Sequence, residues 1–274
     1  MVSLIFVSLS LGVYWNIMKN IMKSLMEINS DAISLRKDFG IDMYSPINVF
    51  PLLMNLVNLT VAFYPMGDNI SGACFKSDSQ KLIVINSNST YGRQRFTAGH
   101  ELCHLFFHEQ LGSVICPNSI EKTKDVKEKE ADKFASYFLA PDEALKDFIF
   151  KNIKVKNKED IDINHIVTIE QHFGLSRMAT LQRLIDDNYL SHEKAKTMRK
   201  DVILSAQKLG FDTKLYLPSP KEQKYSTYGQ YIKFTEELKN KELVSDGKYE
   251  ELLLDAYRSD IVFGLDEQGS ERYD

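Results

Sequence analysis

The pattern of hydrophobic and polar residues in the first half of the chain predicts one helix followed by a small sheet. Apolar positions mixed with charged ones indicate a helix over residues 22–39, which Gly40 can end. Three short runs rich in β-branched and aromatic residues, separated by turn-type sequences, then predict strands. These runs are residues 59–64, 72–76 and 82–85. Because the runs are short and follow one another closely, we expect them to form an antiparallel meander.

Two stronger helical patterns follow the strands. The first covers residues 93–110, and the second covers residues 126–139 and ends before Pro141. A sheet followed by helices is typical of an α+β unit, which we assign to residues 19–150. The polar and highly charged segment 151–160 is interpreted as a linker.

Helical patterns continue beyond the linker. Residues 163–173 and 177–185 have the outline of a helix-turn-helix, so residues 161–190 are expected to form a helical region. Two further helices are predicted in a C-terminal helical tail that covers residues 191–274. The predicted fold class is therefore α+β, with an all-helical region after the unit that carries the sheet.

An uncharged apolar segment, residues 2–18, precedes Lys19. It is at the short limit of the length that crosses a bilayer, and it lacks the positively charged start and the small-residue cleavage site of a secretory signal. Three alternatives remain open for residues 1–18: a membrane anchor, a packed N-terminal helix, or an extension upstream of a later start. Lysines directly after the segment would keep the rest of the chain in the cytoplasm even if it inserted, so we expect a cytoplasmic protein.

The overall charge disfavours nucleic acid as a partner. The 274 residues carry a formal net charge of -4, which gives no basic footprint for a polyanion. Residues 161–190 contain two arginines against four acidic residues, whereas a DNA-reading helix needs cationic groups to meet phosphates. We therefore interpret the helix-turn-helix outline as a packing unit or a protein-recognition surface, and expect no direct binding of nucleic acid.

Candidate chemistry is concentrated in the motif HELCH at residues 100–104. On a helix, His100 and His104 project from one face and can share a metal ion. Neutral imidazoles suit Zn²⁺, which in catalytic sites keeps a fourth position open for water. Glu101 can then take a proton from that water as it attacks a peptide carbonyl. The spacing predicts a zinc-dependent hydrolase with two histidine ligands and one glutamate base.

The third protein ligand is expected to be a carboxylate. The metzincin pattern does not apply, because Gln110 occupies the place of its third histidine. The predicted helix over residues 126–139 offers three candidates, which are Glu128, Glu130 and Asp132. Helical periodicity leaves the choice among them open.

Two segments of the chain resemble the ImmA/IrrE family of metallopeptidases. They are RQRFTAGHELCH at residues 93–104 and EADKFA at residues 130–135, the latter followed by Leu-Ala-Pro. The resemblance implies a zincin-like catalytic domain made of a small antiparallel sheet, a motif helix and a ligand helix. It also implies that the glutamate before the alanine of the second segment, Glu130, is the third zinc ligand. Cys103 departs from the family, which usually has glycine at that position.

The resemblance further implies an endopeptidase that cleaves a helix-turn-helix repressor or an antitoxin protein and so regulates transcription by proteolysis. The alternative is a catalytically weak zinc-fold module that binds and sequesters a regulator. Glu101 favours the enzyme, because a pure binder needs no general base. His108 lies one turn beyond His104, and we interpret it as structural because three protein ligands suffice for catalytic zinc.

Overall fold

The computed structural model describes residues 22–108, 112–117, 125–155 and 160–264. The apolar leader, residues 1–18, lies outside the described residues, so the three alternatives for it stay predictions. Within the described ranges, no helix combines the length and the apolar character that a bilayer crossing requires.

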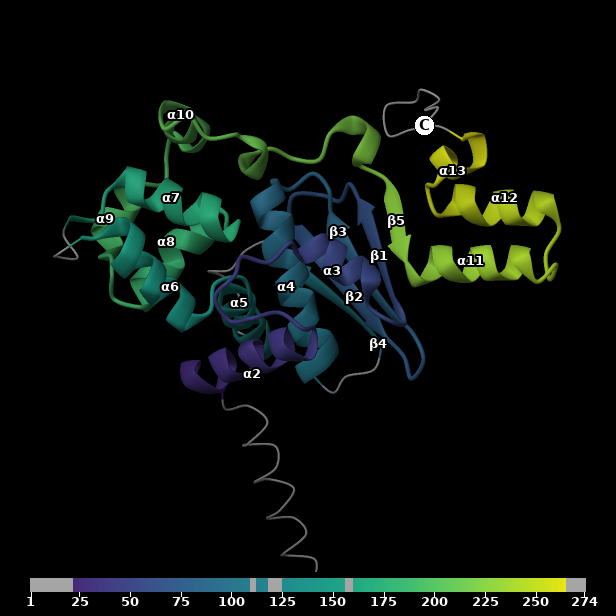
Figure 1. Cartoon of the computed structure of the whole chain (residues 1–274), viewed down its shortest axis with the longest axis horizontal. Helices are drawn as coiled ribbons and strands as arrows, with labels where there is room; N and C mark the ends of the chain where they lie inside the picture. The colour runs from purple at the N-terminus through teal and green to yellow at the C-terminus, as the bar shows by residue number, and fades with distance from the viewer. Residues whose placement is uncertain (1–21, 109–111, 118–124, 156–159, 265–274) are drawn as a thin grey trace, which may run out of the picture.

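A five-stranded sheet lies at the centre of the molecule, with helices gathered on both sides of it in Figure 1. The strand order is β4-β2-β3-β1-β5, and only the pairing of β1 with β3 is parallel. The strands are β1 (Leu59–Tyr64), β2 (Ile70–Lys76), β3 (Lys81–Asn86), β4 (Gly112–Pro117) and β5 (Ser226–Gly229). The predicted α+β fold class is confirmed.

The predicted antiparallel meander is wrong in its pairing. Strands β2 and β3 do form a hairpin, closed by the backbone hydrogen bond from Ser77 to Gln80. Strand β1, however, pairs in parallel with β3, with Val61 opposite Ile83. The alternation of apolar and polar residues along a strand indicates which face is buried, but it does not indicate which strand lies next to it. The three runs were therefore placed correctly, while their order in the sheet was not.

Two strands that were not predicted complete the sheet. Strand β4 falls between the predicted helices 93–110 and 126–139, and β5 falls within the predicted helical tail. Gly229 ends β5 with a φ of 83°, and a Cβ at this position would lie 2.5 Å from the Leu59 carbonyl oxygen. Glycine is therefore required where β5 approaches β1. The tail is thus joined to the α+β unit through the sheet.

One face of the sheet is covered by α3 (Val49–Asn55) and α4 (Tyr91–Phe107), and α4 in turn packs against α5 (Val126–Leu139) (Figure 1). Helix α5 also packs on α2 (Leu25–Asp38). Thr90 is the N-cap of α4, and its hydroxyl accepts a hydrogen bond from the Arg93 amide. The helix ends at Phe107, three residues before the predicted end, and it is the element that carries the HELCH motif.

The remaining helices form two groups on opposite sides of the sheet in Figure 1. The first group is α6 (Asp142–Phe148), α7 (Ile163–Phe173), α8 (Arg177–Asp186), α9 (His192–Thr197) and α10 (Val202–Lys208). The second group follows β5 and is α11 (Gln230–Asn240), α12 (Asp246–Asp255) and α13 (Ser259–Phe263). The predicted linker begins inside a π-helical turn, Ile149–Ile153. Apolar residues of α6, α7 and α8 share a core with Phe96 of α4 and Leu139 of α5.

Both arginines of the helix-turn-helix outline are buried. Arg177 pairs with Glu170, and its Nη2 lies 3.2 Å from Glu170 Oε2. The Nε of Arg183 donates to Asp187 Oδ2 at 2.6 Å. Neither guanidinium reaches the surface, where a phosphate would have to be met. Helices α7 and α8 therefore use these cations for internal packing.

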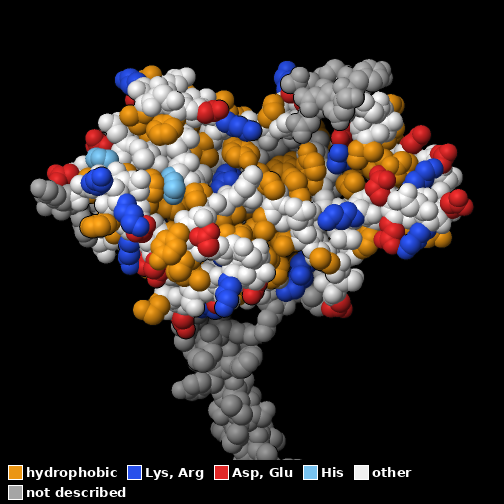
Figure 2. Space-filling view, in the orientation of Figure 1, with side chains coloured by type: hydrophobic (Ala, Val, Ile, Leu, Met, Phe, Trp, Pro, Cys, Tyr) orange, Lys and Arg blue, Asp and Glu red, His pale blue; other side chains and the backbone are white. Residues whose placement is uncertain are grey.

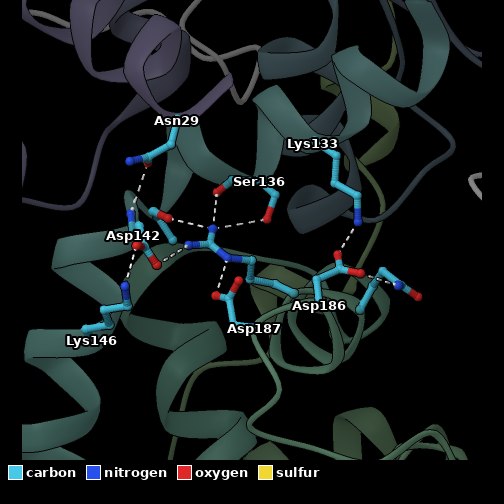
Figure 3. Close-up of polar contacts among 10 residues, drawn as sticks. Asn29, Lys133, Ser136, Asp142, Lys146, Asp186 and Asp187 are labelled. Atoms are coloured by element: carbon cyan, nitrogen blue, oxygen red, sulfur yellow. Dashed lines mark hydrogen bonds and ion pairs between the residues drawn. The ribbon is translucent and has the colours of Figure 1, made fainter. Parts of the chain in front are cut away.

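Arg183 connects α8 to the end of α5. Its Nη1 donates to the carbonyl oxygen of Ala140, the C-cap of α5, at 2.7 Å and to that of Ser136 in the last turn at 3.3 Å. The Ser136 carbonyl also accepts from the Ala140 amide. Figure 3 shows Ser136, Asp142 and Asp187 arranged around this point from α5, α6 and α8. One buried cation thus holds three helices together.

Replacing Arg183 with alanine is expected to lower the free energy of unfolding by about 3 kcal/mol, because removing one partner leaves the other groups buried and unpaired. The matched control is Lys146→Ala, whose ion pair with Asp142 is exposed and is expected to contribute less than about 1 kcal/mol. Urea denaturation followed by circular dichroism measures both changes. Equal midpoints for the two variants would contradict the role assigned to Arg183.

Candidate metal centre

Helix α4 places three motif residues in one buried site between the sheet and α5. His100 and His104 are 6% and 5% exposed, and Glu101 is fully buried. The Nε2 atoms of the two imidazoles lie 3.1 Å apart and point to the same place. Two such nitrogens can be that close only with a proton or a cation between them, since both lone pairs would otherwise repel.

Glu128 supplies a carboxylate to the same place. Its Oε2 lies 3.3 Å from His100 Nε2, and its Oε1 lies 3.3 Å from His104 Nε2. The side chain of Asp125 caps α5, which puts Glu128 in the first turn, facing α4. Two imidazoles and one glutamate are the ligand set of several zinc peptidases.

The structure places Glu130, the third ligand implied by the family resemblance, elsewhere. Glu130 Oε1 accepts a hydrogen bond from the Lys23 backbone amide at 2.7 Å, and its Oε2 lies 3.5 Å from His108 Nε2. Residues two apart on a helix point about 200° away from each other, so Glu128 and Glu130 cannot face the same point. The geometry therefore favours Glu128 as the candidate third ligand, and the assignment to Glu130 stays a prediction of the resemblance.

Both histidines are held from behind by a polar partner. His100 Nδ1 lies 2.9 Å from Asp132 Oδ1, and His104 Nδ1 lies 2.8 Å from His108 Nδ1. With the Nε2 atoms directed into the site, each Nδ1 carries the proton and donates it outward, as metal-ligating histidines do. Burial lowers the pKa of His108 to about 3, which keeps this ring neutral and able to accept. Glu130, next to His108 Nε2, completes a chain of contacts behind His104.

The charges of the site favour a bound cation. Burial alone would lower the pKa of His100, but hydrogen bonds with Asp132 and Glu128 raise it to about 10. Burial would raise the pKa of Glu128, but hydrogen bonds with His100 and His104 lower it to about 2. In the absence of a metal, the carboxylates thus favour positive charge on His100, and Glu128 stays ionised. A divalent cation fits these residues, because it supplies the same positive charge between the same atoms.

Glu101 lies beside this cluster against the sheet. Its Oε2 accepts a hydrogen bond from the Cys116 thiol at 3.4 Å, while its Oε1 is buried and has no hydrogen-bond partner among the described residues. Burial raises the pKa of Glu101, and the two nearby histidines oppose this effect. A Cβ at Gly72 of β2 would lie 2.9 Å from Glu101 Oε1 and 2.5 Å from Thr97 Cγ2. Glycine at position 72 therefore lets α4 and its glutamate approach the strand.

Sequence reasoning missed Cys116 and the supporting role of Asp132. Asp132 was among the three candidate ligands, and its position one turn after Glu128 on the same face could have indicated that it supports a ligand. Cys116 carried no signal, because no strand was predicted over residues 112–117. Within the described part of the chain, one group can hold a metal through ligand atoms that all lie within 4.8 Å of one another: His100, His104, Cys116 and Glu128.

Comparison with known proteins assigns the region that holds this site to a family. Residues 57–185 match the family model of the IrrE N-terminal-like domain, a peptidase family known as M78. This chain contains a peptidase M78 domain. The match begins just before β1 and ends in the last turn of α8, so it includes both α4 and α5. The resemblance to the ImmA/IrrE family is thereby confirmed.

A curated relative comes from a bacteriophage. The uncharacterized immunity region protein 2 of Bacillus phage phi105 is 26% identical over 124 residues, which cover 43% of this chain and 78% of the phage protein. The M78 family assignment supports a peptidase role for the domain, and the cluster on α4, α5 and β4 is where a metal can be held.

The two glutamates of α5 are expected to respond differently to substitution. Glu128→Gln should reduce zinc affinity by more than 100-fold, because it removes a charged ligand. Glu130→Gln should cost about 10–100-fold at most, the range for a group that only supports a ligand. Competition with a chromogenic zinc chelator measures both affinities. Loss of zinc from Glu130→Gln together with full retention by Glu128→Gln would restore the ligand assignment that the family resemblance implies.

Proposed function

We propose that the M78 domain is a zinc-dependent endopeptidase in which His100, His104 and Glu128 hold the metal and Glu101 acts as the general base. The observation that supports this proposal is the convergence of two imidazole nitrogens and a carboxylate at 3.1–3.3 Å. Beside them lies a buried oxygen of Glu101 that has no hydrogen-bond partner within the described part of the chain. A metal site of this composition next to a base is the arrangement needed for hydrolysis of a peptide bond.

When bound, zinc would supply a Lewis acid that polarises the substrate carbonyl and makes water more acidic. Glu101 takes the proton of the attacking water and returns it to the nitrogen of the leaving amine. Burial raises the pKa of Glu101, which makes its carboxylate a stronger acceptor for the proton of water. Asp132 and His108 hold the two imidazoles in the tautomer that directs Nε2 into the site.

The proposed substrate is a helix-turn-helix repressor or an antitoxin protein in the cytoplasm, so that proteolysis regulates transcription. Two observations support a regulatory substrate: the resemblance to the ImmA/IrrE family and a relative named for a phage immunity region. Figure 2 shows acidic and basic side chains interspersed on the visible face, a surface that suits a protein partner better than a polyanion.

Selectivity of this kind requires contacts away from the metal. Binding energy from remote contacts can align one peptide bond with the base and the metal, so that proteins lacking these contacts are cleaved poorly. The segment after β5 offers apolar side chains for such contacts: Leu243, between α11 and α12, is 66% exposed, and Leu254 of α12 is 45% exposed. These helices extend from the sheet edge opposite β4, as Figure 1 shows.

Glu101→Gln is expected to retain one zinc per chain and to lower the rate of cleavage by about 10²–10⁴-fold, because it removes the base and leaves the ligands in place. The matched control is Glu143→Gln, an exposed residue of α6 whose substitution should change neither quantity. Metal analysis and a cleavage assay on the same preparations provide the test. Cleavage at the wild-type rate by Glu101→Gln would show that the proposed base is wrong.

The full-length protein is expected to cleave a helix-turn-helix regulator encoded beside its gene and to leave casein nearly intact, because casein lacks the remote contacts. Incubation with each protein, with and without a metal chelator, followed by mass spectrometry of the fragments, tests this. Rapid chelator-sensitive digestion of casein would contradict the proposed selectivity. A stable complex with the regulator and no fragments would favour the alternative function, sequestration by a weak enzyme.

A further inference from the structure

Cys116 occupies an unusual position for a buried cysteine. It is fully buried on the edge strand β4, opposite Gly72 of β2. Because Gly72 has no side chain, nothing on β2 separates the Cys116 thiol from α4, and its Sγ reaches to 3.4 Å from Glu101 Oε2. The sheet therefore presents a sulfur atom to the catalytic helix at the level of the proposed base.

The same sulfur belongs to the proposed metal site. Cys116 Sγ lies within 4.8 Å of ligand atoms of His100, His104 and Glu128, which also lie within 4.8 Å of one another. In a tetrahedral zinc site with Zn–N bonds near 2.0 Å and Zn–S bonds near 2.3 Å, donor atoms are separated by about 3.5 Å. The four donors thus need only a small adjustment to surround one ion. Thiolate is also a softer ligand for zinc than water or a carboxylate.

We propose that Cys116 serves as a fourth zinc ligand and holds the site in a closed, latent form. This inference rests on the proposed peptidase function, whose mechanism needs the fourth position for water. On closing, the thiol proton passes from Sγ to Glu101 Oε2, and the sulfur joins the ligands. On opening, water replaces the sulfur and the proton returns from Glu101 to Sγ. Closing therefore fills the open position and occupies the general base in one step.

The position of β4 makes such a ligand displaceable. In the described sheet, β4 is an edge strand that pairs only with β2. A shift of this one strand withdraws the sulfur without disturbing His100, His104 or Glu128, which lie on α4 and α5. A protein that docks so as to move β4 would therefore open the site as it binds, whereas an unrelated protein would leave it closed.

The other two cysteines provide internal controls. Cys74 lies on β2 near Glu101, yet it is outside the group of four ligands. Cys103 lies on α4 with its Sγ 4.0 Å from His108 Nε2, behind the histidines rather than in front of them. Cys74 therefore serves as the control for a thiol that packs near the base without reaching the metal site, and Cys116 is the thiol at the metal site.

The test uses the full-length protein loaded with Co²⁺, because a thiolate ligand gives cobalt a strong near-ultraviolet charge-transfer absorption that nitrogen and oxygen ligands do not give. The wild-type protein is expected to show this absorption. Cys116→Ala and Cys116→Ser should both lose it while still binding one metal per chain, and Cys74→Ala should keep it. Circular dichroism verifies folding, and with zinc bound the Cys116 variants should cleave the regulator faster than the wild type does.

Absence of the absorption from the wild type, or its persistence in both Cys116 variants, would overturn the proposal whatever the proteolysis assay shows. If only the Cys116 variants lose the absorption but no variant cleaves any protein, the ligand assignment stands and the proposed peptidase function fails. If they lose it and cleave no faster than the wild type, latency is overturned. The spectroscopic and proteolytic results thus separate the two proposals.

Discussion

The packing of α4 between the sheet and α5 is the constraint on which the site depends. Helix α4 approaches α5 so closely that a Cβ at Gly99 would lie 3.2 Å from Ala135 Cα, and on its other side Gly72 makes room for Glu101. These two glycines allow a helix bearing charged and polar groups to be buried on both sides. The resulting dry environment strengthens every electrostatic interaction among the motif residues.

The rotation of α5 about its axis then decides which carboxylates take part. Glu128 and Asp132 are one turn apart and face α4, where one meets the Nε2 atoms and the other meets His100 Nδ1. Glu130 points to the opposite side of this pair and ends the chain of contacts that supports His104 through His108. All three acidic residues therefore serve the same centre, in roles set by helical geometry. Arg183 fixes the far end of α5, and so the rotation of the helix, through the carbonyls of its last turn.

Much of this architecture could be predicted from the sequence, and the failures have a common physical cause. Hydrophobic periodicity located α5, α7, α8 and the first three strands because it reports local burial. It could not reveal the parallel pairing of β1 with β3, or the recruitment of β5 from residues 226–229, because these are contacts between distant segments. The choice between Glu128 and Glu130 has the same cause. A motif states which residues recur, whereas the ligand role depends on which side of α5 faces α4.

The balance of charge in the centre explains how a thiol can lie among its ligands. Glu128 and Asp132 lie against the two imidazoles, so a divalent cation there is largely neutralised before any further ligand arrives. An additional thiolate would place an extra negative charge in a buried site, which is costly unless a proton remains nearby. Glu101, in contact with both Cys116 and Cys74, is the group that can retain that proton. Exchange between sulfur and water therefore leaves the total charge of the buried site unchanged, and the two states differ mainly in the position of strand β4.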